Sequence, residues 1–235
     1  MNRRLFVAAA TTGIVGASAG CLDGVLEDVT TFEAAPIRVS EDVADETGYA
    51  YQGTVERIEE REFAGEDVEA TNYITEYTRT IDLPLGGLGM EPEAGVFALV
   101  TTPQVGVAGQ EFNPVGDMSE AELAEYVQEQ YDELEIEDNV DSRTIDADEI
   151  GGLETSVSFE TYEGTATLHD EVGVDILVDV AQPDHGDDHL VVIAVTPDME
   201  DVPLDSERDA IDTMVTGIEH GDDVDVELRE AEGDG

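Results

Sequence analysis

The alternation of hydrophobic and polar positions predicts strands over much of the chain. Residues 49–62 and 66–83 are rich in Val, Ile, Tyr and Thr, and Ala64-Gly65 between them offers a turn, so we expect a hairpin there. A glycine-rich loop at 85–95 precedes the apolar run 96–100, which is typical of a short buried strand. Further strands are expected at 140–145, 153–162, 172–181 and 190–195.

The last two of these strands show different patterns. Apolar and mostly polar positions alternate in 172–181, which predicts one buried face and one largely solvated face. The expected buried face consists of Val174, Ile176, Val178 and Val180, and the solvated face of Asp175, Leu177 and Asp179. Residues 190–195 are apolar throughout, so we expect this strand at the centre of a sheet.

Two segments have the spacing of an amphipathic helix. The first begins at a capping box, Ser119 and Glu122, and extends to Leu134. The second follows Pro203 and ends at Gly221, a residue type that favours the left-handed helix cap. The expected core-facing residues are Leu123, Val127, Tyr131 and Leu134 in the first helix, and Ile211, Met214, Val215 and Ile218 in the second.

Many strands joined by short turns, with two substantial helices set apart, predict an α+β fold. We expect a mostly antiparallel β-sheet covered by two main helices, which is an α/β sandwich. The folded part is predicted to be a single domain at 32–220, followed by an acidic flexible tail at 221–235.

The first twenty-one residues have the character of an export signal. Arg3 and Arg4, followed by Phe6 and an apolar run too short to span a bilayer, fit the twin-arginine pattern. Small residues then precede Cys21, which is the only cysteine and resembles the acceptor of a lipoprotein signal. We therefore predict a signal peptide at 1–20, and a lipid anchor on Cys21 with a tether at 21–31. The alternatives are an ordinary charged signal start and a buried apolar thiol.

The charge balance indicates the environment of the protein. The chain has 59 acidic and 9 basic residues and contains no lysine, so removal of residues 1–20 leaves 7 − 59 = −52. This self-repulsion becomes tolerable at molar salt, where the screening length is about 3 Å, so we expect an extreme halophile as the source. Binding to nucleic acid is excluded because there is no basic stripe. Attachment to the membrane then depends on the lipid rather than on charge.

One cluster of residues has the chemistry of metal ligands. His185, Asp187, Asp188 and His189 lie within five residues, and imidazole with carboxylate suits a divalent metal. The alternative is a polar turn between two strands. The segment His220-Gly221-Asp222-Asp223 repeats this pattern directly after a predicted helix, where such residues are typical of a helix end. A G-x-S-x-G match at 16–20 lies inside the signal peptide, so it predicts no hydrolase.

The loops before the first helix form a candidate interaction site. Its residues are Gln104, Phe112, Asn113, Pro114 and Asp117. Apolar Phe112 and the restriction that Pro114 places on Asn113 indicate an ordered segment. The alternative is an entry turn for the helix that starts at Ser119.

Four features together resemble an uncharacterised family of secreted haloarchaeal lipoproteins. They are the twin-arginine lipoprotein signal, the lysine-free acidic body, the stretch 102–119 and the turn His185-Gly186-Asp187-Asp188. The resemblance implies location and architecture but no catalytic residue. The order of strands and helices in the second half is also similar to Mog1/PsbP-like domains, a fold-level likeness that implies no function.

The sequence therefore predicts a lipid-anchored extracytoplasmic binding or accessory module at the outer face of the cell membrane. No catalysis is expected, and no cofactor beyond the lipid on Cys21. The expected partner is a membrane or cell-surface protein. The alternative is a metal-dependent extracytoplasmic enzyme that uses the cluster His185 to His189. A solute receptor of a transporter is disfavoured, because such receptors need two lobes and this chain shows one compact pattern.

Overall fold

The computed structural model describes residues 30–63, 66–81, 93–107, 110–111, 118–130, 134–168, 172–200 and 202–229. Several residues singled out above lie outside these ranges, namely Arg3, Arg4, Phe6, Cys21, Phe112, Asn113, Pro114, Asp117 and Tyr131. In the part of the chain that the structure describes, no helix has both the length and the apolar character needed to cross a membrane.

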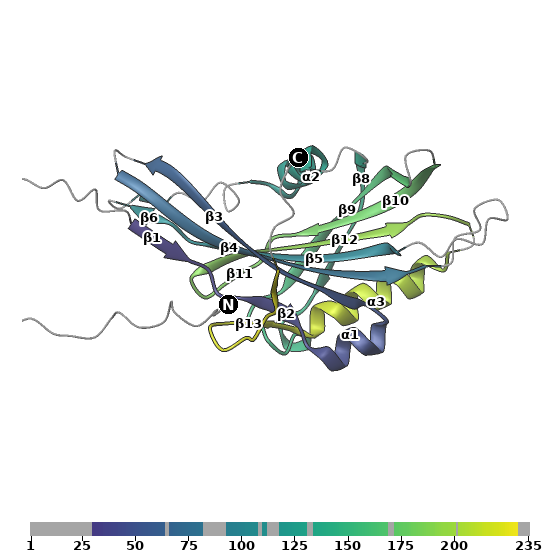
Figure 1. Cartoon of the computed structure of the whole chain (residues 1–235). Helices are drawn as coiled ribbons and strands as arrows, with labels where there is room; N and C mark the ends of the chain where they lie inside the picture. The colour runs from purple at the N-terminus through teal and green to yellow at the C-terminus, as the bar shows by residue number, and fades with distance from the viewer. Residues whose placement is uncertain are drawn as a thin grey trace, which may run out of the picture.

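A ten-stranded sheet dominates the structure, with the strand order β14-β3-β4-β5-β12-β10-β9-β8, while β1 pairs with β4 and β11 with β12 (Figure 1). The long strands are β3 Ala50–Phe63, β4 Glu66–Thr80, β5 Glu93–Pro103, β8 Leu134–Ile145, β9 Val157–Leu168, β10 Val172–Ala181 and β12 Asp188–Pro197. The short ones are β1 Thr30–Glu33, β11 Asp184–His185 and β14 Leu228–Arg229. The predicted hairpin is confirmed as β3 and β4, and the predicted central strand as β12 between β5 and β10.

The remaining elements are short strands and helices. β2 Ile37–Val39 pairs with β13 Ile218–His220, and β6 Gly106–Val107 pairs with β7 Gln110–Glu111. The helices are α1 Glu41–Thr47, α2 Glu120–Gln130 and α3 Leu204–Thr216, with a 3-10 helix at Ala147–Glu149.

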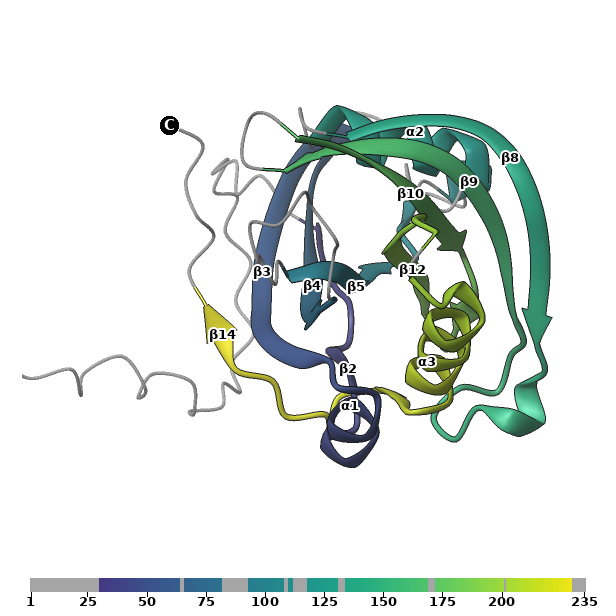
Figure 2. The same ribbon diagram turned by 90° about the vertical axis from the view of Figure 1, so that its right-hand side faces the viewer.

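The sheet is strongly curved and carries helices on both faces. Its strands bend around α3 and α1 (Figure 2), whereas α2 lies on the opposite side (Figure 1). Alternate residues of β10 show the two faces: Val178 and Val180 pack in one cluster with Leu123 of α2, and Ala181 in another with Ile211 of α3. The larger core therefore lies inside the curve of the sheet, and the smaller one lies under α2.

The expected fold class is wrong. The molecule is mostly β, its sheet is mixed because β1 and β14 pair in parallel with β4 and β3, and three α-helices occur in the described residues. The segments that make the sheet mixed are only two to four residues long, too short to show a hydrophobic period. The short helix α1 escaped detection for the same reason. The β14 strand also ties Leu228–Arg229, inside the expected tail, to the sheet.

Both predicted helices begin as expected but end earlier. The capping box is confirmed, since Glu122 Oε2 accepts hydrogen bonds from the Ser119 backbone N–H (2.9 Å) and hydroxyl (2.8 Å). The described helix ends at Gln130, and Leu134 instead opens β8. The second helix ends at Thr216, and its cap is Gly217 rather than Gly221. A Cβ at Gly217 would lie 2.7 Å from Val43, so packing of α1 against this corner requires glycine there.

Candidate functional site

The predicted metal cluster lies on the β11–β12 hairpin at one end of the sheet. In this antiparallel pair, Asp184 is opposite His189 and His185 is opposite Asp188, so adjacent pairs point to opposite faces. His189 bonds through Nδ1 to Asp184, apart from His185 and Asp188. The predicted set does not converge, and the described residues contain no group of three or more side chains placed to hold a metal.

The structure brings a different histidine to this hairpin. His220, the last residue of β13, places its Nδ1 2.8 Å from Nδ1 of His185, with the rings edge to face and their centroids 5.1 Å apart. The pairing of β13 with β2 holds His220 opposite Ile37, and its side chain is only 4% exposed. His220 belongs to the second His-Gly-Asp-Asp copy, so this copy is more than the helix end that its place in the sequence indicates.

Asp188 completes a chain of hydrogen bonds. Its Oδ2 lies 3.0 Å from Nε2 of His220 and accepts the backbone N–H of Ala35 at 2.8 Å. Because an ionised carboxylate only accepts, it selects the His220 tautomer with a proton on Nε2 and a lone pair on Nδ1. His185 then donates from its own Nδ1. Two distant segments, at Ala35 and His220, are thereby joined to the hairpin.

Burial sets the electrostatics of His185. Partial burial lowers the pKa of its imidazole, and the nearby His220 lowers that pKa further, while Glu154 and Asp188 act in the opposite direction. Of these two carboxylates, Asp188 is the more buried, with a side chain that is 8% exposed, whereas Glu154 is exposed. The lowered pKa favours the neutral form of His185, and one buried carboxylate aligns the His220 ring beside it.

One residue of the predicted interaction loop joins the same end of the sheet. The backbone N–H of Gln104 donates to the carbonyl of Asp187 at 2.9 Å, so the strand end after β5 is tied to the hairpin turn. Gln104, Gly186 and Asp187 are all exposed, and we call these three residues the hairpin edge. Gly186 adopts a φ of 64°, and a Cβ there would meet nothing within 4 Å, so the turn faces outward. The other loop residues lie outside the described ranges.

A second polar cluster lies between α3 and the inner face of the sheet. Arg143 bonds Asp179 of β10 and Asp212 of α3, each at 2.8 Å, and its guanidinium lies 4.5 Å from the ring centre of Phe159. Asp179 is 5% exposed, which corrects the prediction that it faces solvent. The reason is that α3 covers this face, and burial of Asp179 is compensated by Arg143 and by Thr161.

The same layer continues toward the N-terminal end of α3. Arg79 pairs with the buried Glu207 of α3 at 3.2 Å and lies 5.8 Å from the ring centre of Tyr49. Burial raises the pKa of the Tyr49 hydroxyl above its usual range, so the phenol stays neutral. These side chains attach α3 to the sheet.

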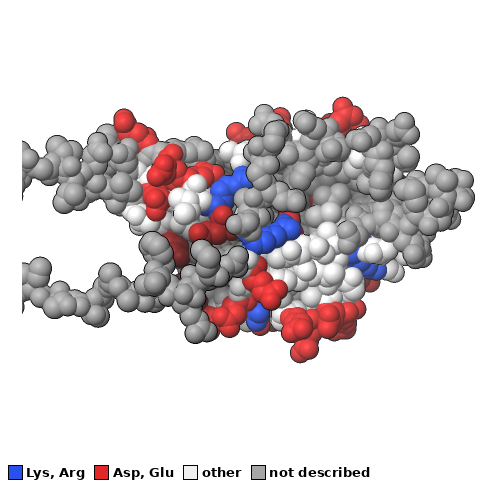
Figure 3. All heavy atoms as spheres, viewed as in Figure 1, with Lys and Arg blue, Asp and Glu red and all other residues white. Residues whose placement is uncertain are grey.

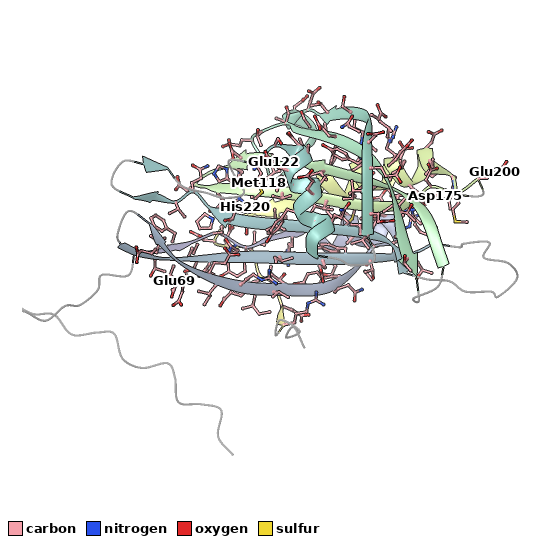
Figure 4. All side chains as sticks on the ribbon, turned by 90° about the horizontal axis from the view of Figure 1, so that it is seen from above. Glu69, Met118, Glu122, Asp175, Glu200 and His220 are labelled. Carbon is pink, nitrogen blue, oxygen red and sulfur yellow. The ribbon has the colours of Figure 1, made fainter. Side chains whose placement is uncertain are left out.

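Figure 4 shows how far the two ends of the molecule are separated. His220 lies in the half of the molecule that also holds Glu69, and the exposed Asp175 and Glu200 lie at the opposite end. The hairpin edge lies in the same half as His220, because His185 and Asp187 belong to the same hairpin.

The chain belongs to a protein family described as a domain of unknown function (DUF6517), whose model matches residues 36–219. The match covers all three helices and every long strand. This confirms the expected membership of an uncharacterised family. The lipoprotein character, the haloarchaeal source and the likeness to Mog1/PsbP domains stay predictions. No curated protein matches the chain.

Proposed function

We propose that this protein is an exported, lipid-anchored binding or accessory module of an extreme halophile, which holds a membrane or cell-surface protein partner at the outer face of the cell membrane. The signal at 1–20 and the position of Cys21 support export and anchoring. The acidic side chains spread over the face seen in Figure 3 support a halophilic source, since such a surface suits high salt.

The observation that carries the binding role is the hairpin edge. Its exposed residues are held by backbone bonds from two neighbouring strands, which gives a partner a surface of fixed shape. By contrast, the buried carboxylates are engaged in holding the fold together. Asp179 neutralises Arg143, Glu207 neutralises Arg79, and Asp188 fixes Ala35 and His220. These partners favour binding over catalysis.

The length of chain between Cys21 and Ala35 limits how far the hairpin edge can lie from a lipid anchor. Ala35, which bonds Asp188, lies 14 residues after Cys21. An extended chain covers at most about 3.3–3.6 Å per residue, so these residues reach no farther than about 50 Å. A lipid on Cys21 therefore keeps the hairpin edge close to the membrane, where a membrane protein partner is accessible.

Site-specific photocrosslinking in intact cells at working salt tests the binding role. We place a photoreactive amino acid at Gln104 in one variant and at the exposed Asp175, at the opposite end of the sheet, in a matched control. We expect one abundant crosslinked protein from position 104 and none from position 175. Identical products from both positions would contradict the proposed surface. Turnover of any substrate by the purified protein, abolished by a single side-chain change, would contradict a non-catalytic role.

Anchoring has a separate test. Cys21→Ser removes the thiol that receives the lipid, so the protein should appear in the medium or accumulate with its signal uncleaved. Cell fractionation with an antibody against the folded domain measures both outcomes. Retention of processed Cys21→Ser protein in the membrane fraction would show that another feature holds it there.

A further inference from the structure

We propose that His185 and His220 form a binding site for a divalent transition metal such as Zn²⁺ or Co²⁺, with both Nδ1 atoms as ligands and Asp188 as the residue that orients His220. This ligand pair differs from the cluster that the sequence suggested, since His189 and Asp187 are not part of it. The site does not depend on the proposed binding function, because it involves different atoms from those of the hairpin edge.

The spacing of the two nitrogens fits a shared metal. Zn²⁺ binds imidazole nitrogen at about 2.0–2.1 Å, and tetrahedral geometry then separates two ligand nitrogens by about 3.3 Å. The observed separation of the two Nδ1 atoms is 2.8 Å. An opening of about 0.5 Å, which a small rotation of the partly buried His185 ring provides, makes room for the ion. Without a metal, one proton bridges the same two nitrogens.

Asp188 provides the support that metal-binding histidines usually have. Such a histidine almost always donates its other ring N–H to a carboxylate or a carbonyl, which fixes the tautomer and the direction of the lone pair. His220 does so through Nε2 to Asp188, and the carboxylate is itself held by the backbone N–H of Ala35. The Nδ1 lone pair of His220 is therefore directed at His185 before any metal arrives.

The surroundings favour a cation with an open coordination sphere. The described residues provide no third side chain that converges on the two nitrogens, so water or a group from a partner fills the remaining positions. The formal net charge of −50 raises the local concentration of divalent cations. The two kinds of ligand also prefer different metals. Carboxylates of the acidic surface prefer Mg²⁺ and Ca²⁺, whereas the imidazoles of this site prefer Zn²⁺, Co²⁺ and Ni²⁺.

Metal titration of the purified full-length chain tests the proposal. Zn²⁺ binding is followed by calorimetry, and Co²⁺ binding by its visible absorption, in molar KCl with excess Mg²⁺ to occupy surface carboxylates. We expect one saturable site. His185→Ala should weaken it at least tenfold, and Asp188→Asn should weaken it by about 10- to 100-fold through loss of orientation. His189→Ala is the matched control, because His189 bonds Asp184 on the other face of the hairpin, and it should leave the affinity unchanged.

The variant of the buried histidine needs its own safeguard. His220→Gln keeps a polar side chain for Asp188, and its far-UV circular dichroism should match that of the parent before its metal affinity is compared. We expect this variant to lose the Co²⁺ band as well. Absence of a saturable site, or equal affinity in the parent, His185→Ala and His220→Gln, would overturn the proposal. Neither result affects the crosslinking outcome at Gln104, so the two proposals fail independently.

Discussion

At the scale of single residues, Gly152 is the glycine of the described residues at which an added Cβ would meet its nearest neighbour at the shortest distance. A Cβ at this position would lie 2.0 Å from the carbonyl oxygen of Ile218, closer than any real contact. Gly152→Ala should therefore displace β13, and with it His220, at a cost of several kcal/mol, within the upper range for single substitutions. Thermal unfolding at molar salt measures the loss. The neighbouring Gly151 is the matched control, because its Cβ would lie 3.7 Å from Thr216 and Gly151→Ala should be nearly neutral. Equal losses in both variants would contradict this account.

The same scale shows which residues of the site could be found from sequence. His185 and Asp188 were singled out because imidazole and carboxylate side chains lie close together along the chain. The role of His220 could not be predicted, because it depends on the pairing of β13 with β2, two segments at opposite ends of the chain. The burial of Asp179 could not be predicted for a similar reason. Its partner Arg143 belongs to β8, a strand distant in sequence from the alternating pattern of 172–181.

At the scale of elements, Arg143 attaches α3 to the sheet. Its side chain is 15% exposed and bridges Asp179 of β10 and Asp212 of α3. Arg143→Gln should destabilise the fold by about 3–5 kcal/mol, because it leaves the buried Asp179 without its positive partner. Chemical denaturation at fixed salt measures this loss. Arg208→Gln removes an exposed pair with Asp141 and serves as the control, with an expected cost of about 0–1 kcal/mol. If the two variants lose equal stability, Arg143 does not have this role.

For the two predicted helices, local signals located the beginning of the element better than its end. The strand 172–181 and the capping box at Ser119 are recognisable because each depends on neighbouring residues only. The end of α3 depends on contact of Gly217 with Val43 of α1, and the strand β8 begins at Leu134, whose spacing also fits the face of the preceding helix. The apolar pattern does not show whether Leu134 ends a helix or begins a strand, because both kinds of element bury an apolar residue there.

At the scale of the whole molecule, the sheet is mixed rather than antiparallel because of two segments that are too short to show a hydrophobic period. β1 and β14 together contribute six residues, yet they turn an otherwise antiparallel sheet into a mixed sheet. The helix α2 covers the face of the sheet opposite to α1 and α3, so a single layer of helices is ruled out. Charge, in contrast, is a property that the sequence determines completely.

The formal charge of −50 makes stability depend on salt. At least five arginines of the described residues form ion pairs with acidic side chains, but the whole chain has 59 acidic and only 9 basic residues, so its cations can neutralise only a minority of the carboxylates. Screening shortens the range of this repulsion from about 10 Å at 0.1 M salt to about 3 Å at 1 M. The unfolding temperature should therefore rise by tens of degrees between 0.1 and 3 M KCl. Sucrose at matched osmolality is the control, because it favours compact states without screening charge. An equal rise in sucrose, or none in KCl, would show that repulsion among the carboxylates does not limit stability.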